Sequence, residues 1–85
     1  MKQVSSNYAR FLVLLRVLVD ETRKDEPMSM VDIQKRLQEY GAYLDEKTIL
    51  RHIEYMEEGG VLIARRLPDK KQRGSYLYWY EDGWV

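Results

Sequence analysis

The chain has 85 residues, which is enough for one domain with a single core and too few for two. Its 14 Lys and Arg residues balance 14 Asp and Glu residues, and 45% of its residues are hydrophobic, a composition typical of a folded globular protein rather than a disordered one. The absence of Cys excludes disulfide frameworks and thiolate metal sites and favours a cytoplasmic location.

The first predicted helix covers residues 5–24, with candidate N-caps at Ser5, Ser6 and Asn7. Its apolar run, residues 11–19, is much shorter than the roughly 20 residues of a membrane span, so no membrane association is expected. At about 100° per residue, the predicted core face consists of Tyr8, Phe11, Leu12, Leu15, Leu18 and Val19. Val13 and Val17 fall on the opposite side, where they are either a homodimer interface or ordinary exposed apolar residues.

Two further helices are predicted at residues 29–41 and 45–58, joined by a short turn that contains Gly41. Ser29 followed by Asp32 is a variant of the capping box, and Asp45 is the N-cap expected for the last helix. The core stripe of that helix is predicted to be Ile49, Ile53 and Met56, and Gly59-Gly60 ends it. Two helices with this connection have helix-turn-helix spacing.

The remaining residues predict a β-hairpin over residues 61–80. A tail follows at residues 81–85, and it is long enough for its Trp84 to fold back over the core. Tyr76, Tyr78 and Tyr80 alternate with Leu77 and Trp79 along the last strand, so the two sets face opposite ways. We expect one face of this strand to close the core; a stacking platform for single-stranded nucleic acid is the alternative. The whole chain, residues 1–85, is therefore predicted to be one α+β, mainly α domain, a winged helix-turn-helix.

Residues 10–80 also resemble a known family. The Pro-apolar-Ser start of the second helix, the opening Lys47-Thr48-Ile49 of the third with Arg51 and Ile53 after it, and the exit at Gly59-Gly60 are similar to the N-terminal winged helix-turn-helix domain of WYL-type bacterial transcriptional regulators. The chain departs from that pattern at Leu50 and His52, and it stops before a WYL domain. The resemblance implies a bacterial or phage DNA-binding regulator, present either as a stand-alone protein or as a domain fragment.

The candidate DNA-reading residues are Lys47, Thr48 and Arg51, on the side of the third helix opposite its core stripe. The N-terminal half of such a helix enters the major groove, where Lys and Arg bind guanine O6 and N7, and Thr48 can contact a phosphate instead. The alternative is a solvated face with Arg51 paired to Glu54.

The hairpin tip is the second candidate site, because residues 65–73 carry five positive charges and one negative charge. A wing beside a helix-turn-helix brings such charges to the DNA backbone or minor groove. The expected phosphate contacts are Arg65, Arg66, Lys70, Lys71 and Arg73, with Ser29 offering its hydroxyl or nearby N–H groups. The alternative is a flexible, solvated loop.

Catalytic chemistry has little support in the sequence. His52 is the only histidine, and the chain contains no Gly-rich phosphate loop and no HExxH motif. We therefore predict no enzyme activity, no metal site and no cofactor. The expected function is sequence-specific binding of double-stranded DNA by a dimeric regulator, and the alternative is a protein-binding winged helix, favoured by zero net charge, the glutamates of the third helix and the expected exposure of Leu50, Tyr55 and Val17.

Overall fold

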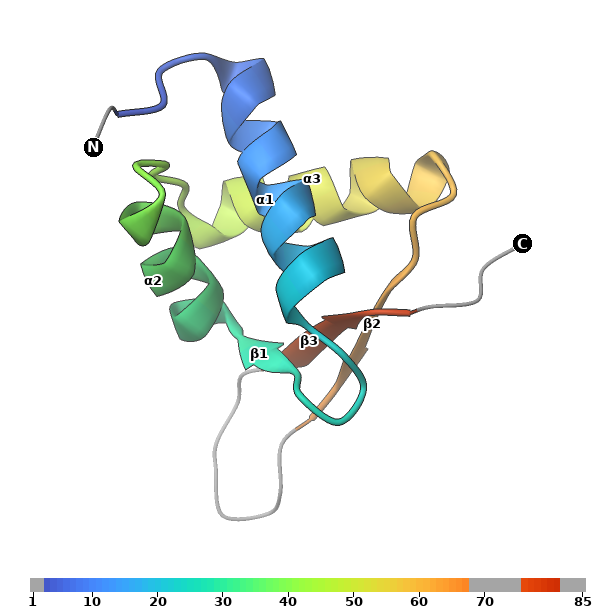
Figure 1. Cartoon of the computed structure of the whole chain (residues 1–85). Helices are drawn as coiled ribbons and strands as arrows, with labels where there is room; N and C mark the ends of the chain where they lie inside the picture. The colour runs from blue at the N-terminus through green and yellow to red at the C-terminus, as the bar shows by residue number, and fades with distance from the viewer. Residues whose placement is uncertain (1–2, 68–75, 82–85) are drawn as a thin grey trace.

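The structure, a computed structural model, describes residues 3–67 and 76–81 (Figure 1). This part of the chain contains three helices and a three-stranded antiparallel sheet with strand order β1-β3-β2. The elements in chain order are α1 (Asn7–Glu21), β1 (Met28–Ser29), α2 (Met30–Glu39), α3 (Glu46–Glu58), β2 (Ile63–Arg66) and β3 (Leu77–Tyr80). The α+β class is confirmed, and the element order is compatible with a winged helix.

The helix α1 is shorter than the predicted range at both ends. Its N-cap is Ser6, whose hydroxyl accepts a hydrogen bond from the Ala9 N–H at 3.3 Å. It stops at Glu21 because Thr22 is extended, with its side chain tied to two elements. The Thr22 hydroxyl donates to the Leu18 carbonyl oxygen at 2.6 Å and accepts from the Tyr80 N–H at 2.8 Å, which joins the end of α1 to β3.

The core face of α1 differs from the predicted one. Leu14, Val17 and Leu18 are the buried residues, whereas Tyr8 is 85% exposed and Leu12 is 58% exposed. The expected position of Val17 on the outer side is wrong, since it is only 1% exposed, and Val13 also packs against the core. Most positions between 11 and 19 are apolar, so periodicity alone could not locate the centre of the buried face.

The capping residues of α2 and α3 are the predicted ones. The Ser29 hydroxyl accepts from the Asp32 N–H at 3.2 Å, and the Asp45 carboxylate accepts from the Thr48 N–H at 2.8 Å. Gly41 has a φ of 81°, and the Ala42 N–H donates to the Leu37 carbonyl oxygen, which is the Schellman geometry that ends α2. These local signals fix the connection between α2 and α3.

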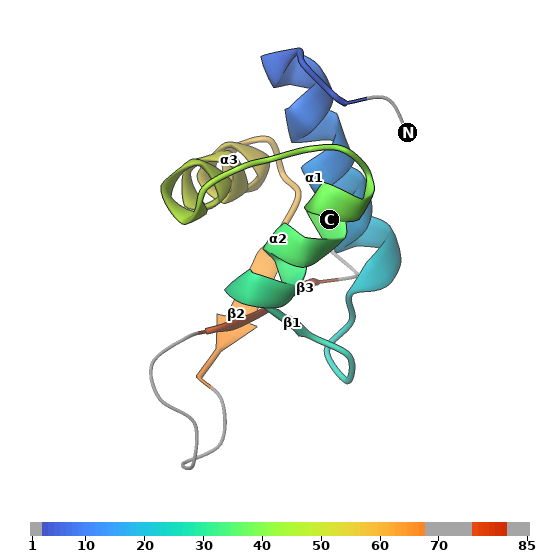
Figure 2. The ribbon, with the colours of Figure 1, turned by 90° about the vertical axis from the view of Figure 1, so that its left-hand side faces the viewer.

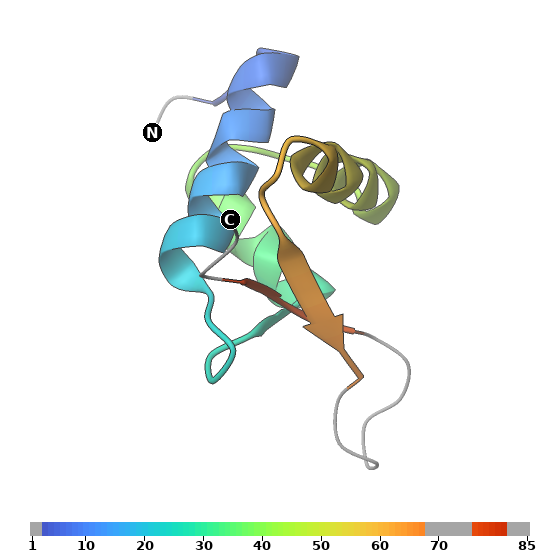
Figure 3. The same ribbon diagram turned by 90° about the vertical axis from the view of Figure 1, so that its right-hand side faces the viewer.

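The buried stripe of α3 is also as predicted, with Ile49, Ile53 and Met56 all in the core. Gly60, with a φ of 92°, ends the helix, and the chain then turns into β2. Figures 2 and 3 show α1 and α3 on different sides of the domain, with α2 and the sheet completing the small core between them. The position of α3 therefore leaves one long side of it open to solvent.

The sheet is centred on β3, which pairs with β2 on one edge and with β1 on the other. The strand β1 was not predicted from the sequence. Tyr78 is 4% exposed and contributes to the core, and Trp79, its neighbour on the opposite face, is 6% exposed. Both faces of β3 are thus covered, which favours a packing role for these two rings over a stacking platform.

A polar cluster joins α1 to α2. The Arg36 guanidinium forms an ion pair with Glu21, and the Tyr40 hydroxyl donates to the same carboxylate at 2.7 Å. Partial burial would raise the pKa of Glu21, but the hydrogen bonds from Arg36 and Tyr40 outweigh it and lower the pKa. The hydrogen bond to Glu21 in turn raises the pKa of Tyr40. Because Arg36 and Tyr40 both contact Glu21, the cluster holds the C-terminal ends of the two helices together.

Candidate nucleic-acid interface

The exposed charges of α3 are unevenly distributed. Its first half exposes Lys47 and Arg51, one helical turn apart, together with Glu46 in the first turn, and its second half exposes Glu54, Glu57 and Glu58. Adjacent cations at this spacing cost an isolated helix a few tenths of a kcal/mol, about 0.2–0.5, because like charges repel. An anion bound beside them would reverse that cost.

Within the described part of the chain, the two cations are not neutralised by close ion pairs. Among residues 3–67 and 76–81, both salt bridges are formed by Arg36, and no carboxylate of these ranges lies within 4.0 Å of the Lys47 or Arg51 side-chain nitrogens. The alternative in which Arg51 pairs with Glu54 is therefore not what the structure shows. Both side chains are exposed and available to a partner.

Thr48 is placed differently from its two neighbours. It is half-buried, and its backbone N–H donates to the Asp45 carboxylate at 2.8 Å. Hydrogen bonding with Thr48 lowers the pKa of Asp45. Thr48 thus lies half-buried at the N-cap, which leaves Lys47 and Arg51 as the exposed cations at the start of α3.

Arg65 on β2 lies beside the same end of α3. It is paired with Tyr78 across the ladder, and its guanidinium lies 5.5 Å from the ring centre of Tyr76. Burial, together with the nearby Glu46 charge, raises the pKa of Tyr78, while Arg65 acts in the opposite direction. The charges of both Arg65 and Glu46 thus act on Tyr78, which places β2 and the first turn of α3 on the same side of β3.

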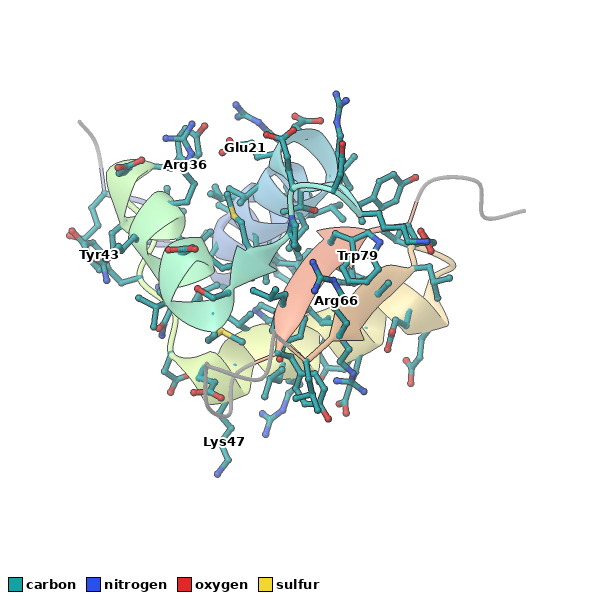
Figure 4. The ribbon with its side chains drawn as sticks, turned by 90° about the horizontal axis from the view of Figure 1, so that it is seen from below. Glu21, Arg36, Tyr43, Lys47, Arg66 and Trp79 are labelled. Atoms are coloured by element: carbon teal, nitrogen blue, oxygen red, sulfur yellow. The ribbon has the colours of Figure 1, made fainter. Side chains whose placement is uncertain are left out.

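Arg66 and Ser29 form a second group, on the other side of the sheet. Arg66 of β2 and Ser29 of β1 are both paired with Leu77 of β3, so they lie on either side of the same residue. Neighbouring strands are about 5 Å apart. Figure 4 shows Arg66 over the sheet beside Trp79, whereas Lys47 projects from the beginning of α3. The structure therefore brings Lys47, Arg51 and Arg65 toward one end of α3 and places Arg66 on a different face.

The predicted contacts Lys70, Lys71 and Arg73, and also Trp84, lie outside the described residues. What the structure does fix is the base of that segment, because β2 ends at Arg66 and β3 begins at Leu77. The contact of Arg65 with the Tyr76 ring was missed by the sequence reasoning. Alternation along residues 75–80 suggested a strand but carried no sign of its register against β2.

The surface expected for a protein partner is only partly present. Tyr55 is 52% exposed, as expected, but Leu50 packs against the core and Val17 is inside it. His52 lies at the edge of the core, with its ring 5.2 Å from that of Phe11 in an edge-to-face arrangement. Its Nδ1 atom is buried and has no hydrogen-bond partner among the described residues.

In residues 3–67 and 76–81, no cluster of three His, Asp or Glu side chains could hold a metal ion, and none of the three helices is long and apolar enough to cross a membrane. No protein-family model, no curated protein and no solved structure matches the chain. The functional interpretation therefore rests on the geometry of α3 and the sheet.

Proposed function

We propose that this domain is a winged helix-turn-helix that binds double-stranded DNA as a small transcriptional regulator. The observation that carries the proposal is the pair Lys47 and Arg51, exposed and without a close carboxylate in the described structure, at the start of the second helix of a helix-turn-helix. Arg65, held beside the same end of α3, adds a third positive charge from the base of the hairpin.

In this proposal the first half of α3 enters the major groove. Arg51 offers a planar pair of donors to guanine O6 and N7, and Lys47 binds a second acceptor or a phosphate. The glutamates follow in the second half of the helix, which points out of the groove. Arg65, Arg66 and the predicted tip residues Lys70, Lys71 and Arg73 hold the DNA backbone.

The first test measures binding to a mixed-sequence fluorescent duplex by anisotropy at several salt concentrations. Each phosphate contact contributes about −0.9 to the slope of log affinity against log salt, so the two described cations assigned to the backbone, Arg65 and Arg66, give a slope of roughly −2 per domain before any contact by the tip residues is added. Tight binding that weakens steeply with salt supports the proposal and justifies selecting a preferred site. No binding at low salt overturns it and directs attention to a protein partner for the Tyr55 surface.

Two variants separate base reading from backbone binding. Arg51→Ala should cost about 1–3 kcal/mol on the selected site and relax specificity, whereas Lys71→Ala should weaken all sequences alike and reduce the salt slope by about 1. Lys24→Ala is the matched control, since it removes the same charge from the exposed loop between α1 and β1, which lies away from α3 in Figure 2. Arg51→Ala behaving like Lys24→Ala would mean that α3 does not read DNA.

A further inference from the structure

The exposed side of α1 carries an apolar stripe that the proposed DNA contacts do not use. Tyr8, Leu12, Leu15 and Val19 succeed one another at intervals of four, three and four residues, which is the spacing of a coiled-coil seam. Tyr8 and Leu12 are 85% and 58% exposed, and the other two are half-buried. Apolar side chains at all four seam positions of an exposed helix face indicate an interaction surface.

A groove runs along the same stripe near the C-terminal end of α1. Its volume is about 360 Å³, and its exposed lining is almost entirely apolar. The lining residues are Leu12, Leu15, Arg16, Val19, Asp20, Val61 and Tyr80. The helix therefore has a protruding aromatic ring near its beginning and an apolar depression near its end.

We propose that a second copy of this chain occupies the groove, with the two α1 helices packed antiparallel about a two-fold axis between Leu12 and Leu15. In that arrangement Tyr8 of each copy lies opposite Val19 of the other and enters its groove. Leu12 lies opposite Leu15 in the two central layers. A two-fold axis makes the contact self-complementary and closed, so it ends at a dimer.

Charge also favours the antiparallel direction. The first turn of α1 has no acidic residue, and its last turn has no basic residue of its own, although the Arg36 guanidinium of α2 is paired with Glu21 there. Antiparallel packing brings the last turn, with Asp20, beside the positive first turn of the other copy. A parallel pair would place Tyr8 against Tyr8 and leave both grooves without an aromatic ring.

The seam lies away from the proposed DNA surface. Figure 2 shows α3 at the left edge of the domain and α1 to its right, and Figure 3 shows the chain leaving α3 as it descends beside α1. The groove is lined by Val61 of that segment and by residues of α1. Two copies joined through α1 thus keep Lys47 and Arg51 exposed. The dimer does not depend on DNA binding, and it replaces Val17, which is buried, as the seam residue.

The test is the molar mass of the 10.2 kDa chain by analytical ultracentrifugation over a concentration series. A contact through one helix is at the low end of specific interfaces, near ~1,200 Å² in total, so we expect a monomer–dimer equilibrium. Leu12→Glu should abolish the dimer while leaving the far-ultraviolet circular dichroism unchanged. Tyr43→Ser, at another exposed aromatic side chain (57% exposed), should leave the dimer intact.

Cysteine pairs test the direction, because the chain has no Cys of its own. A mixture of Tyr8→Cys and Val19→Cys chains should form a disulfide-linked heterodimer on mild oxidation. Tyr8→Cys alone should not, since 11 residues separate it from its opposite position, about 16 Å along the helix. A monomer at every concentration, a Leu12→Glu variant that still dimerises, or cross-linking of Tyr8→Cys alone would each overturn the proposal.

Discussion

The helices α1 and α3 bury equal numbers of core residues and differ in what they expose. The core residues are Leu14, Val17 and Leu18 in α1 and Ile49, Ile53 and Met56 in α3. The outer side of α3 is charged, whereas that of α1 is an apolar stripe. The contrast teaches that the buried residues of a helix indicate how it packs in the fold, whereas its exposed residues indicate which kind of partner it binds.

The largest expected effect concerns the buried sides of α1 and α3, compared with the exposed side of α1. Leu14→Ala in α1 and Ile53→Ala in α3 should each lower the free energy of unfolding by about 2–5 kcal/mol, because each leaves a cavity in the core. Leu12→Ala, the same change on the exposed side, should cost less than about 0.5 kcal/mol in the monomer. Urea unfolding of dilute protein measures all three, and equal losses for Leu12→Ala and Leu14→Ala would contradict the observed face of α1.

A second prediction concerns the polar end of α1. Thr22→Val keeps the shape of the side chain but removes the hydroxyl that bonds Leu18 and Tyr80, and should cost about 1–3 kcal/mol. Thr22→Ser is the matched control, since it retains the hydroxyl and loses only a methyl group. If the valine variant is as stable as the serine variant, this link between α1 and β3 contributes little.

The smallest expected effect lies where α1 and α3 meet, at His52 beside Phe11. Burial of the imidazole ring, together with the nearby Arg51 charge, lowers the pKa of His52 below its ordinary value of 6.5. The unfolded chain therefore binds a proton more readily, and stability should fall as pH drops from about 6.5 toward the lower pKa of the folded state.

The His52→Leu variant tests this dependence, because it has no imidazole to titrate. The urea midpoint of each protein is measured at about pH 7 and about pH 5.5. The decrease in the midpoint between these two pH values should be smaller in the variant than in the parent. The same acid loss in both proteins would assign it to other groups.

Sequence reasoning worked best where the signal was local. The caps at Ser29 and Asp45, and the left-handed glycines Gly41 and Gly60, lie within a few residues of the helix ends they determine. The stripe of α3 was equally accessible, because charged residues separate its apolar positions. The helices α2 and α3 could therefore be predicted before any tertiary contact was known.

The features that escaped prediction depend on distant residues. The strand β1 has two residues, and its identity comes from pairing with β3, with Met28 opposite Tyr78. The Glu21–Arg36 pair joins residues 15 apart, with no periodic pattern to indicate it. Of the candidate site, the positions of Lys47 and Arg51 followed from helix periodicity, whereas the place of Arg65 beside α3 depended on the register between β2 and β3.

The central position of β3 has a consequence for how the protein folds as it is made. Its strand closes the sheet between two earlier strands, and its Tyr80 N–H reaches Thr22, which is 58 residues back in the chain. The segments of α1, α2 and α3 leave the ribosome before this strand, so the three helices cannot complete their packing until β3 is available. We therefore expect the nascent domain to become protease-resistant in one late step, once Tyr80 has left the exit tunnel, because its decisive contacts are non-local.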